Sequence, residues 1–222
     1  PNNDGIDVDS CRNVLIEHCI FNTEDDCVVL KSGYNEDGRR VGRPTENVIM
    51  RHCFSKRGHG GLVIGSEMSG DVRNVYMHDC RFEGTDRAVR IKSRRDRGGI
   101  VEDIYIENLV AMEMQREVVL LNMAYTADRM VPNETEPPVF RNIHIRNILA
   151  SGAPEAIRIR GMAESPIQNL VFEDIVIRSR EGIFIEHARN ILLRDLVVVT
   201  DTGRRMVLDN VAGLVLENTE GN

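Results

Sequence analysis

RNVLIEHC, at residues 12–19, is the first of a series of similar eight-residue segments in this 222-residue chain. In each segment a marker residue, usually Asn, is followed at the first and third positions by apolar residues. The segment returns at residues 46–53, 73–80, 102–109, 141–148, 168–175 and 189–196, and in a weaker form at 212–219. The marker is Asp103 in one copy and Gly213 in another. Apolar residues at every second position predict a strand with one buried face.

A second apolar segment follows each marker at a nearly constant distance. Val28, Leu62, Val89, Val118 and Ile157 lie 15 residues after their markers, and Ile183 lies 14 after. Repeats of 21–39 residues that contain several short strands are typical of a parallel β-solenoid. We therefore predict an all-β fold, a right-handed parallel β-helix of about seven to eight coils that forms a single domain over residues 1–222.

Stacking of equivalent positions explains several residues that would otherwise suggest a site. Cys19, Cys53 and Cys80 share a column with aliphatic residues, so we expect a buried ladder of small hydrophobic side chains rather than a metal site or a disulfide. His18 and His52 fall where a turn is expected. The fourth position after the marker carries largely alternating charge, which predicts ion pairs between coils on an exposed face.

Composition excludes several classes of function. The net charge of −7 argues against a general nucleic-acid binder. The sequence has no apolar run long enough to span a membrane. Trp is absent, which excludes a sugar site built on stacked tryptophans.

The residues that the repeat does not explain are concentrated in the first 95 positions. Asp25 and His59 fall at the same position of successive coils, so we expect their side chains on one strip of the surface. The full set comprises Asp4, Asp25, Asp26, His59, Arg90 and Lys92.

The chemistry of this set suggests a glycosidase. Two crowded carboxyls, Asp25 and Asp26, are expected to hold one proton at a raised pKa, which provides an acid and a base in one site. Six basic residues lie between Arg87 and Arg97 and suggest a polyanionic sugar as ligand. Within this stretch we expect Arg94, Arg95 and Arg97 to belong to a solvated loop.

These residues resemble the polygalacturonase family, glycoside hydrolase family 28. Its four motifs match Asn2-Asn3-Asp4, with Asn3 in place of Thr, and then Asp25-Asp26, Gly58-His59-Gly60 and Arg90-Ile91-Lys92. The resemblance implies hydrolysis of α-1,4 bonds between galacturonic acid units with inversion. It implies that Asp25 is the general acid and that Asp4 and Asp26 activate water. It implies that His59 tunes the acid or holds the hydrogen-bond network, and that Arg90 and Lys92 hold the substrate carboxylate. By spacing alone it adds Tyr125 as a sugar contact. It implies no metal and no organic cofactor.

Compared with that family the chain lacks the usual N-terminal coils, so we expect a truncated β-helix whose first coil exposes an open edge. The expected partner is an anionic galacturonan, with no nucleic acid or membrane partner, and a monomer. An insertion at Tyr34–Pro44 mildly favours exo action. The first alternative is an inactive or binding-only fragment, and a pectate lyase is the second. Any targeting signal would lie upstream of Pro1, so the location stays open.

Overall fold

The computed structural model describes residues 2–126 and 136–219, and these residues are almost entirely strand. In the described part of the chain a single short helix interrupts the strands. The elements are β1 (Ile6–Asp9), β2 (Arg12–Glu17), β3 (Ile20–Phe21), β4 (Val28–Lys31), α1 (Asn35–Val41), β5 (Thr45–Arg51), β6 (Phe54–Ser55), β7 (Leu62–Ile64), β8 (Val72–Glu83), β9 (Val89–Lys92), β10 (Ile100–Met112), β11 (Glu117–Asn122), β12 (Val139–Arg160), β13 (Ile167–Thr200) and β14 (Met206–Glu217).

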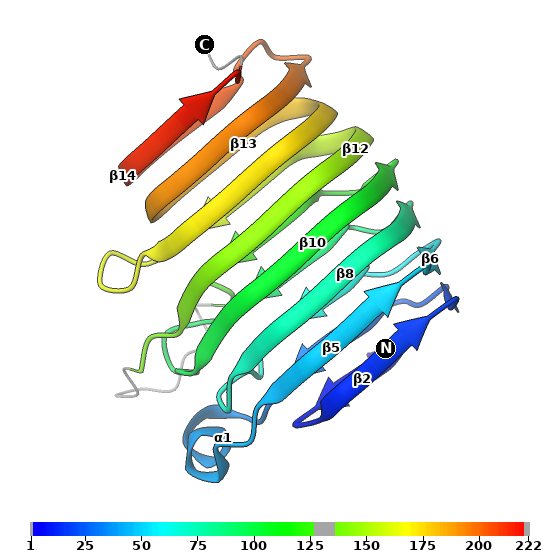
Figure 1. Cartoon of the computed structure of the whole chain (residues 1–222), viewed down its shortest axis with the longest axis vertical. Helices are drawn as coiled ribbons and strands as arrows, with labels where there is room; N and C mark the ends of the chain where they lie inside the picture. Colours follow the sequence, from blue (N-terminus) through cyan, green and yellow to red (C-terminus); the bar gives the residue numbers. More distant parts are fainter. Residues whose placement is uncertain (1, 127–135, 220–222) are drawn as a thin grey trace.

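The strands form a parallel solenoid, as the repeat predicts. Strands β1, β4, β7, β9 and β11 pair in that order along one face, and β2, β5, β8, β10 and β12 pair along another. Figure 1 shows the coils stacked from the blue N-terminal end to the red C-terminal end. The number of coils and the single-domain extent stay predictions. Among the described residues, no helix is long and apolar enough to cross a membrane.

The interior is a set of aliphatic columns, one residue per coil. One column contains Val28, Leu62 and Val89, which are aligned partners in adjacent strands. The aligned residue of the next coil is Val119, so the prediction of Val118 at this position was wrong. The reason is one extra residue in the turn after Met112, where the spacing between paired residues changes from 29 to 30.

The corners of the coils explain the marker residue. Asn13, Asn47 and Asn74 all have φ between +54° and +58°, and Asp103 and Gly213 adopt the same left-handed conformation. Gly, Asn and Asp are the residues that tolerate this region best, so the marker position accepts these three types. The amides also form a ladder between coils, in which Asn47 Nδ2 donates to Asn13 Oδ1 at 2.9 Å.

The column of cysteines and the two histidines also follow the prediction. Cys53 and Cys80 are buried among aliphatic residues, Cys19 is half-buried, and all three are free thiols. His18 and His52 have positive φ and lie at a corner. Both columns therefore serve the fold.

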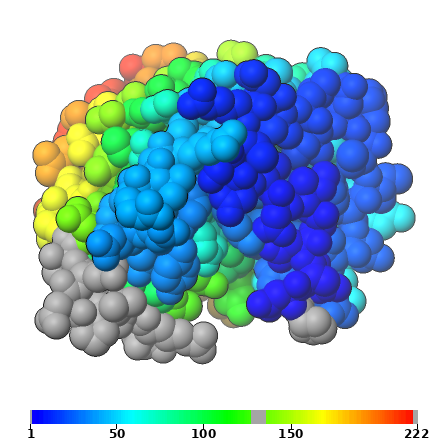
Figure 2. All heavy atoms as spheres, turned by 90° about the horizontal axis from the view of Figure 1, so that it is seen from below, coloured from blue at the N-terminus to red at the C-terminus, as the bar shows by residue number. Residues whose placement is uncertain are grey.

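The insertion after β4 forms the short helix α1. It begins after Tyr34 and ends at Gly42, which has the left-handed conformation common at helix C-termini. Arg39 of this helix donates from Nη1 to the carbonyl oxygens of Asp96 and Arg97, at 3.2 and 2.9 Å. These bonds fix α1 against the turn that follows β9. Figure 2 shows the dark blue N-terminal segment and the lighter blue segment around α1 at the same end of the molecule.

Candidate active site

Strands β1, β4, β7 and β9 bring the side chains of the motif residues together. Asp4 precedes β1, Asp25 and Asp26 precede β4, and His59 precedes β7, so parallel pairing places them at the same end of adjacent strands. Arg90 and Lys92 lie on β9, and Tyr125 follows β11. All seven residues proposed from the sequence line one pocket of about 610 Å³.

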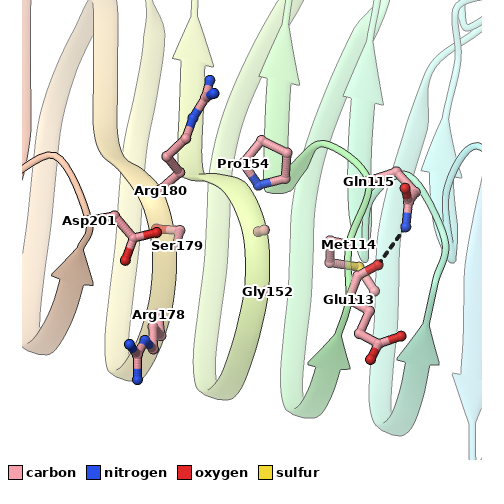
Figure 3. A pocket seen from close by; sticks show the side chains of 10 residues that line it. Glu113, Met114, Gln115, Gly152, Pro154, Arg178, Ser179, Arg180 and Asp201 are labelled. Atoms are coloured by element: carbon pink, nitrogen blue, oxygen red, sulfur yellow. Dashed lines mark hydrogen bonds between the residues drawn. The ribbon is translucent and has the colours of Figure 1, made fainter.

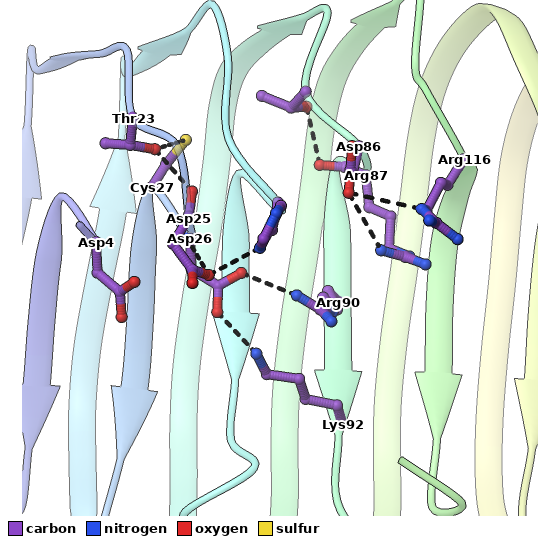
Figure 4. Close-up of polar contacts among 12 residues, drawn as sticks. Asp4, Thr23, Asp25, Asp26, Cys27, Asp86, Arg87, Arg90, Lys92 and Arg116 are labelled. Carbon is purple, nitrogen blue, oxygen red and sulfur yellow. Dashed lines mark hydrogen bonds and ion pairs between the residues drawn. The ribbon is translucent and has the colours of Figure 1, made fainter. Parts of the chain in front are cut away.

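Asp26 is the buried member of the carboxylate group. Its Oδ1 accepts a hydrogen bond from Arg90 Nη1 at 3.1 Å and its Oδ2 accepts one from Lys92 Nζ at 2.8 Å. Figure 4 shows both cations reaching from β9 toward Asp26, across the intervening coil of β7. Gly60 lies in that coil, and a Cβ there would be 3.5 Å from Arg90 Cβ. The closest contact of such a Cβ would be Val63 Cγ2 at 2.5 Å, so the glycine of the Gly58-His59-Gly60 motif leaves room for Val63 in the same coil.

Asp25 turns away from Asp26 toward His59. A hydrogen bond of 2.9 Å joins Asp25 Oδ1 and His59 Nδ1, and the Asp26 amide N–H donates to the same oxygen at 2.9 Å. Partial burial alone would raise the pKa of Asp25. The nearby His59, the Asp26 amide and Lys92 outweigh burial and hold this pKa below its ordinary value. The expectation of a raised pKa was therefore wrong for Asp25, because its carboxylate has cationic and hydrogen-bonding partners of its own.

Asp4 is the carboxyl with the raised pKa. Burial raises it, Lys31 opposes the rise, and the negative charges of Asp25 and Asp7 add to it. Lys31 Nζ lies 3.3 Å from Asp4 Oδ2 and also contacts Asp7 Oδ1. Sequence reasoning missed Lys31, although it occupies the position in β4 that Lys92 occupies in β9. That shared position was the signal that could have found it.

The pocket wall beyond β9 corrects a further expectation. Arg94 and Arg97 are only 5% and 3% exposed, so they do not belong to a solvated loop. Helix α1 and the turn after β9 pack together and enclose both side chains, and the Arg97 guanidinium lies 3.9 Å from the centre of the Tyr34 ring. Arg95 points elsewhere, is nearly half exposed and pairs with Glu164.

Comparison with known proteins identifies the family of the chain. The sequence model of "Glycosyl hydrolases family 28" matches residues 1–192 of the chain. The chain belongs to this family. The resemblance inferred from the four motifs is thereby confirmed.

Two relatives illustrate the similarity of this family 28 chain to longer proteins. A protein from Vitis vinifera described as a probable polygalacturonase is 32% identical over 80% of this chain and 36% of its own length. A crystal structure of a hyperthermoactive exopolygalacturonase from Thermotoga maritima is 37% identical over 90% of this chain and 44% of its own, with a TM-score of 0.84. The chain thus spans less than half of each.

A third comparison concerns the fold alone. The family 28 exopolygalacturonase of Yersinia enterocolitica has a TM-score of 0.85 over 96% of this chain, at 18% identity. The β-helix of the family is thus preserved when most side chains differ.

One group in this family 28 chain has the composition of a metal site. Ligand atoms of Asp25, Asp26 and His59 all lie within 4.8 Å of one another. Both Asp26 oxygens already contact Arg90 and Lys92, whose charges oppose a second cation. The arrangement therefore fits proton transfer better than cation binding.

A slightly larger hollow, of about 660 Å³, lies over later coils. Figure 3 shows Arg178, Arg180 and Asp201 around it, together with the Glu113–Gln115 turn. Its described lining residues include no histidine and none of the motif residues. The residues of the four motifs therefore lie in the pocket over β1, β4, β7 and β9 and not in this hollow.

Proposed function

We propose that this chain carries the active site of an inverting glycoside hydrolase that cleaves α-1,4 bonds between galacturonic acid units of pectin. The observation that carries this proposal is the convergence of Asp4, Asp25, Asp26 and His59 on one pocket that also contains Arg90 and Lys92. Carboxyls supply the acid and base that such hydrolysis requires, and cations suit an anionic sugar. The names of the relatives from grape and Thermotoga support the same substrate.

The carboxyls take distinct roles in this proposal. Asp25 protonates the leaving oxygen, and His59 can hold or return that proton through the 2.9 Å contact. Asp4, together with Asp26, orients and deprotonates the attacking water. Arg90 and Lys92 fix Asp26 and place positive charge beside the substrate carboxylate. Tyr125 covers both cations, with its ring centre 5.5 and 5.2 Å from them.

The directions of the pKa shifts favour an alternative in which Asp4 is the general acid and Asp25 the base. Asp4 is the more readily protonated carboxyl and Asp25 the more readily ionised one, which is the order expected if the two exchange roles. A substrate whose leaving group needs no proton separates the assignments. It restores turnover to a variant that lacks the general acid and leaves a variant without the base inactive.

Exo action is part of the proposal. Tyr34 stands beside α1 and lines the pocket, so the insertion provides a wall at one side of the site. A walled site holds the end of a chain better than its middle. The exopolygalacturonase name of the Thermotoga relative supports this mode. A monomeric state and the lack of nucleic-acid and membrane partners stay predictions.

A reducing-sugar assay on polygalacturonate tests the proposal, with the Asp25→Asn variant as its control. We expect turnover by the unchanged chain and a loss of about 100- to 10,000-fold in the variant. Release of monomers alone indicates exo action. Equal rates for the two proteins contradict the catalytic assignment.

Two further readouts separate the alternatives. A product that absorbs in the ultraviolet indicates a lyase, because elimination leaves an unsaturated bond. Measurable binding of oligogalacturonide without turnover indicates the binding-only fragment.

A further inference from the structure

One wall of the same pocket takes no part in the proposed proton transfers and is formed by Tyr34, Arg94, Arg97 and Thr126. Arg94 is held rigidly there. Its Nε donates to Asp96 Oδ1 at 2.6 Å, and Asp96 is fully buried. One edge of the guanidinium is thereby fixed, and its orientation does not depend on a ligand.

The two terminal nitrogens of Arg94 have weaker partners. Nη1 lies 3.3 Å from Thr126 Oγ1, and Nη2 lies 3.3 Å from Tyr34 Oη. Both contacts are long for a charged donor, and both acceptors are neutral hydroxyls. A carboxylate can replace them with shorter, charge-assisted bonds.

The other pocket cations in the described part of the chain differ in this respect. Arg90 Nη1 and Lys92 Nζ contact the Asp26 carboxylate, and Lys31 Nζ contacts the carboxylates of Asp4 and Asp7. Arg97 Nη2 lies 3.7 Å from Glu67. Arg94 differs from these cations in that both of its terminal nitrogens contact neutral hydroxyls.

Contacts of Arg97 and Arg39 fix the position of Tyr34 and α1 beside Arg94. Arg97 packs against the Tyr34 ring, and Arg39 ties α1 to the carbonyls of Asp96 and Arg97. The Tyr34 hydroxyl is consequently held beside Arg94 by Arg97 and by the contacts of α1. A preorganised fork of this kind loses little entropy when it binds a planar anion.

We propose that Arg94, flanked by the Tyr34 and Thr126 hydroxyls, binds the carboxylate of a second uronate unit, next to the unit held at Arg90 and Lys92. Arg94 lies two residues beyond Lys92, a distance of about 7 Å in extended chain. The site then requires a free carboxylate on both units and discriminates against a substrate esterified on the second one. This inference rests on the proposed function and names the substrate class of that pocket.

Titration calorimetry with galacturonate and digalacturonate tests the inference, in chains that carry Asp25→Asn to prevent turnover. We expect Arg94→Gln to weaken digalacturonate binding about 10- to 100-fold, the usual effect of losing a charge-assisted pair. Binding of the monomer should change little. Esterification of the second carboxylate should weaken binding to the parent chain by a similar factor and have little effect on binding to the variant.

Two further variants separate the loss of the guanidinium fork from a loss of positive charge or of the fold. Arg94→Lys keeps a positive charge beside buried Asp96 but lacks the fork, so it should fold and still lose most of the affinity. Arg95→Gln lies one residue away, outside the pocket, and should bind as the parent does. Thermal unfolding checks each protein.

The outcomes distinguish the two proposals. If the parent chain binds digalacturonate and the Arg94 variants bind it equally well, the second-carboxylate site is wrong and the proposed function stands. If the parent chain binds no galacturonide, both are overturned.

Discussion

The solenoid presents charged side chains on two faces, and the two faces use them differently. On the face formed by β2, β5, β8 and β10, a cation meets an anion in the neighbouring coil. Arg73 Nε lies 2.7 Å from Glu46 Oε2, and Arg51 Nη2 lies 2.7 Å from Glu17 Oε2. These arginines are about 40% exposed, so water screens each pair.

On the face formed by β1, β4, β7 and β9, one carboxylate and its two cations are two coils apart and buried. Asp26 is 2% exposed, and its two cations reach it from β9 past the coil of β7. The first arrangement follows from stacking alone. The second needs two long side chains that reach past the intervening coil, which stacking of equivalent positions does not supply.

Removal of the buried anion should have the largest effect. Asp26→Asn leaves Arg90 and Lys92 without their counter-charge in a nearly dry site, and we expect it to lower the free energy of unfolding by about 3–5 kcal/mol. Chemical denaturation measures this. A double variant with Lys92→Met should recover part of the loss, since one uncompensated charge is gone. If Asp26→Asn lowers the free energy of unfolding by only about 0.2–1 kcal/mol, as expected for an exposed pair, the two faces do not differ in the strength of their ion pairs.

The pH profile provides the next test. His59→Gln removes the strongest influence that lowers the pKa of Asp25, so burial should prevail and this pKa should rise. If Asp25 is the general acid, activity is lost as pH rises through its pKa, and the alkaline limb of kcat/KM moves to higher pH. If Asp25 is the base, the acid limb moves to higher pH instead. His18→Gln, at a distant corner, should move neither limb.

The corners of the coils should show a moderate effect. Asn47→Ala removes two amide contacts of the ladder and places a Cβ-bearing apolar residue at φ +57°. We expect a loss of about 1–2 kcal/mol in the free energy of unfolding. Asn47→Gly accepts the same φ, so it should lose less. Equal losses would mean that the ladder, rather than the conformation, determines the residue type.

The smallest effect is expected on the exposed face. Arg73→Gln should lower the free energy of unfolding by about 0.2–1 kcal/mol, and the difference should shrink in high salt because the pair is screened. Denaturation at two salt concentrations measures it. A loss that matches that of Asp26→Asn would show that stacking alone creates strong pairs.

Much of the fold could be predicted because each coil repeats the same local demands. The buried columns and the charged ladder each recur at nearly the same position relative to the marker residue of every coil, so they can be read from the sequence. The misplacement of Val118 shows the limit. One added residue in a turn shifts a register, and a turn carries little periodic signal.

The members of the site could also be predicted, since Asp4, Asp25, Asp26, His59, Arg90, Lys92 and Tyr125 all line one pocket. Their pairing could not. The sequence places Asp25 beside Asp26, but the two side chains point in different directions, and their partners come from other coils.

The sequence by itself thus determined the solenoid, its corners, its family and the identity of the residues that meet. Only the tertiary structure decided that Asp26 pairs with Arg90 and Lys92, that Lys31 joins Asp4, and that Arg94 and Arg97 are enclosed. The physical reason is that stacking follows spacing along the chain, whereas burial and charge pairing depend on side chains that reach across coils and on the insertion that packs over them.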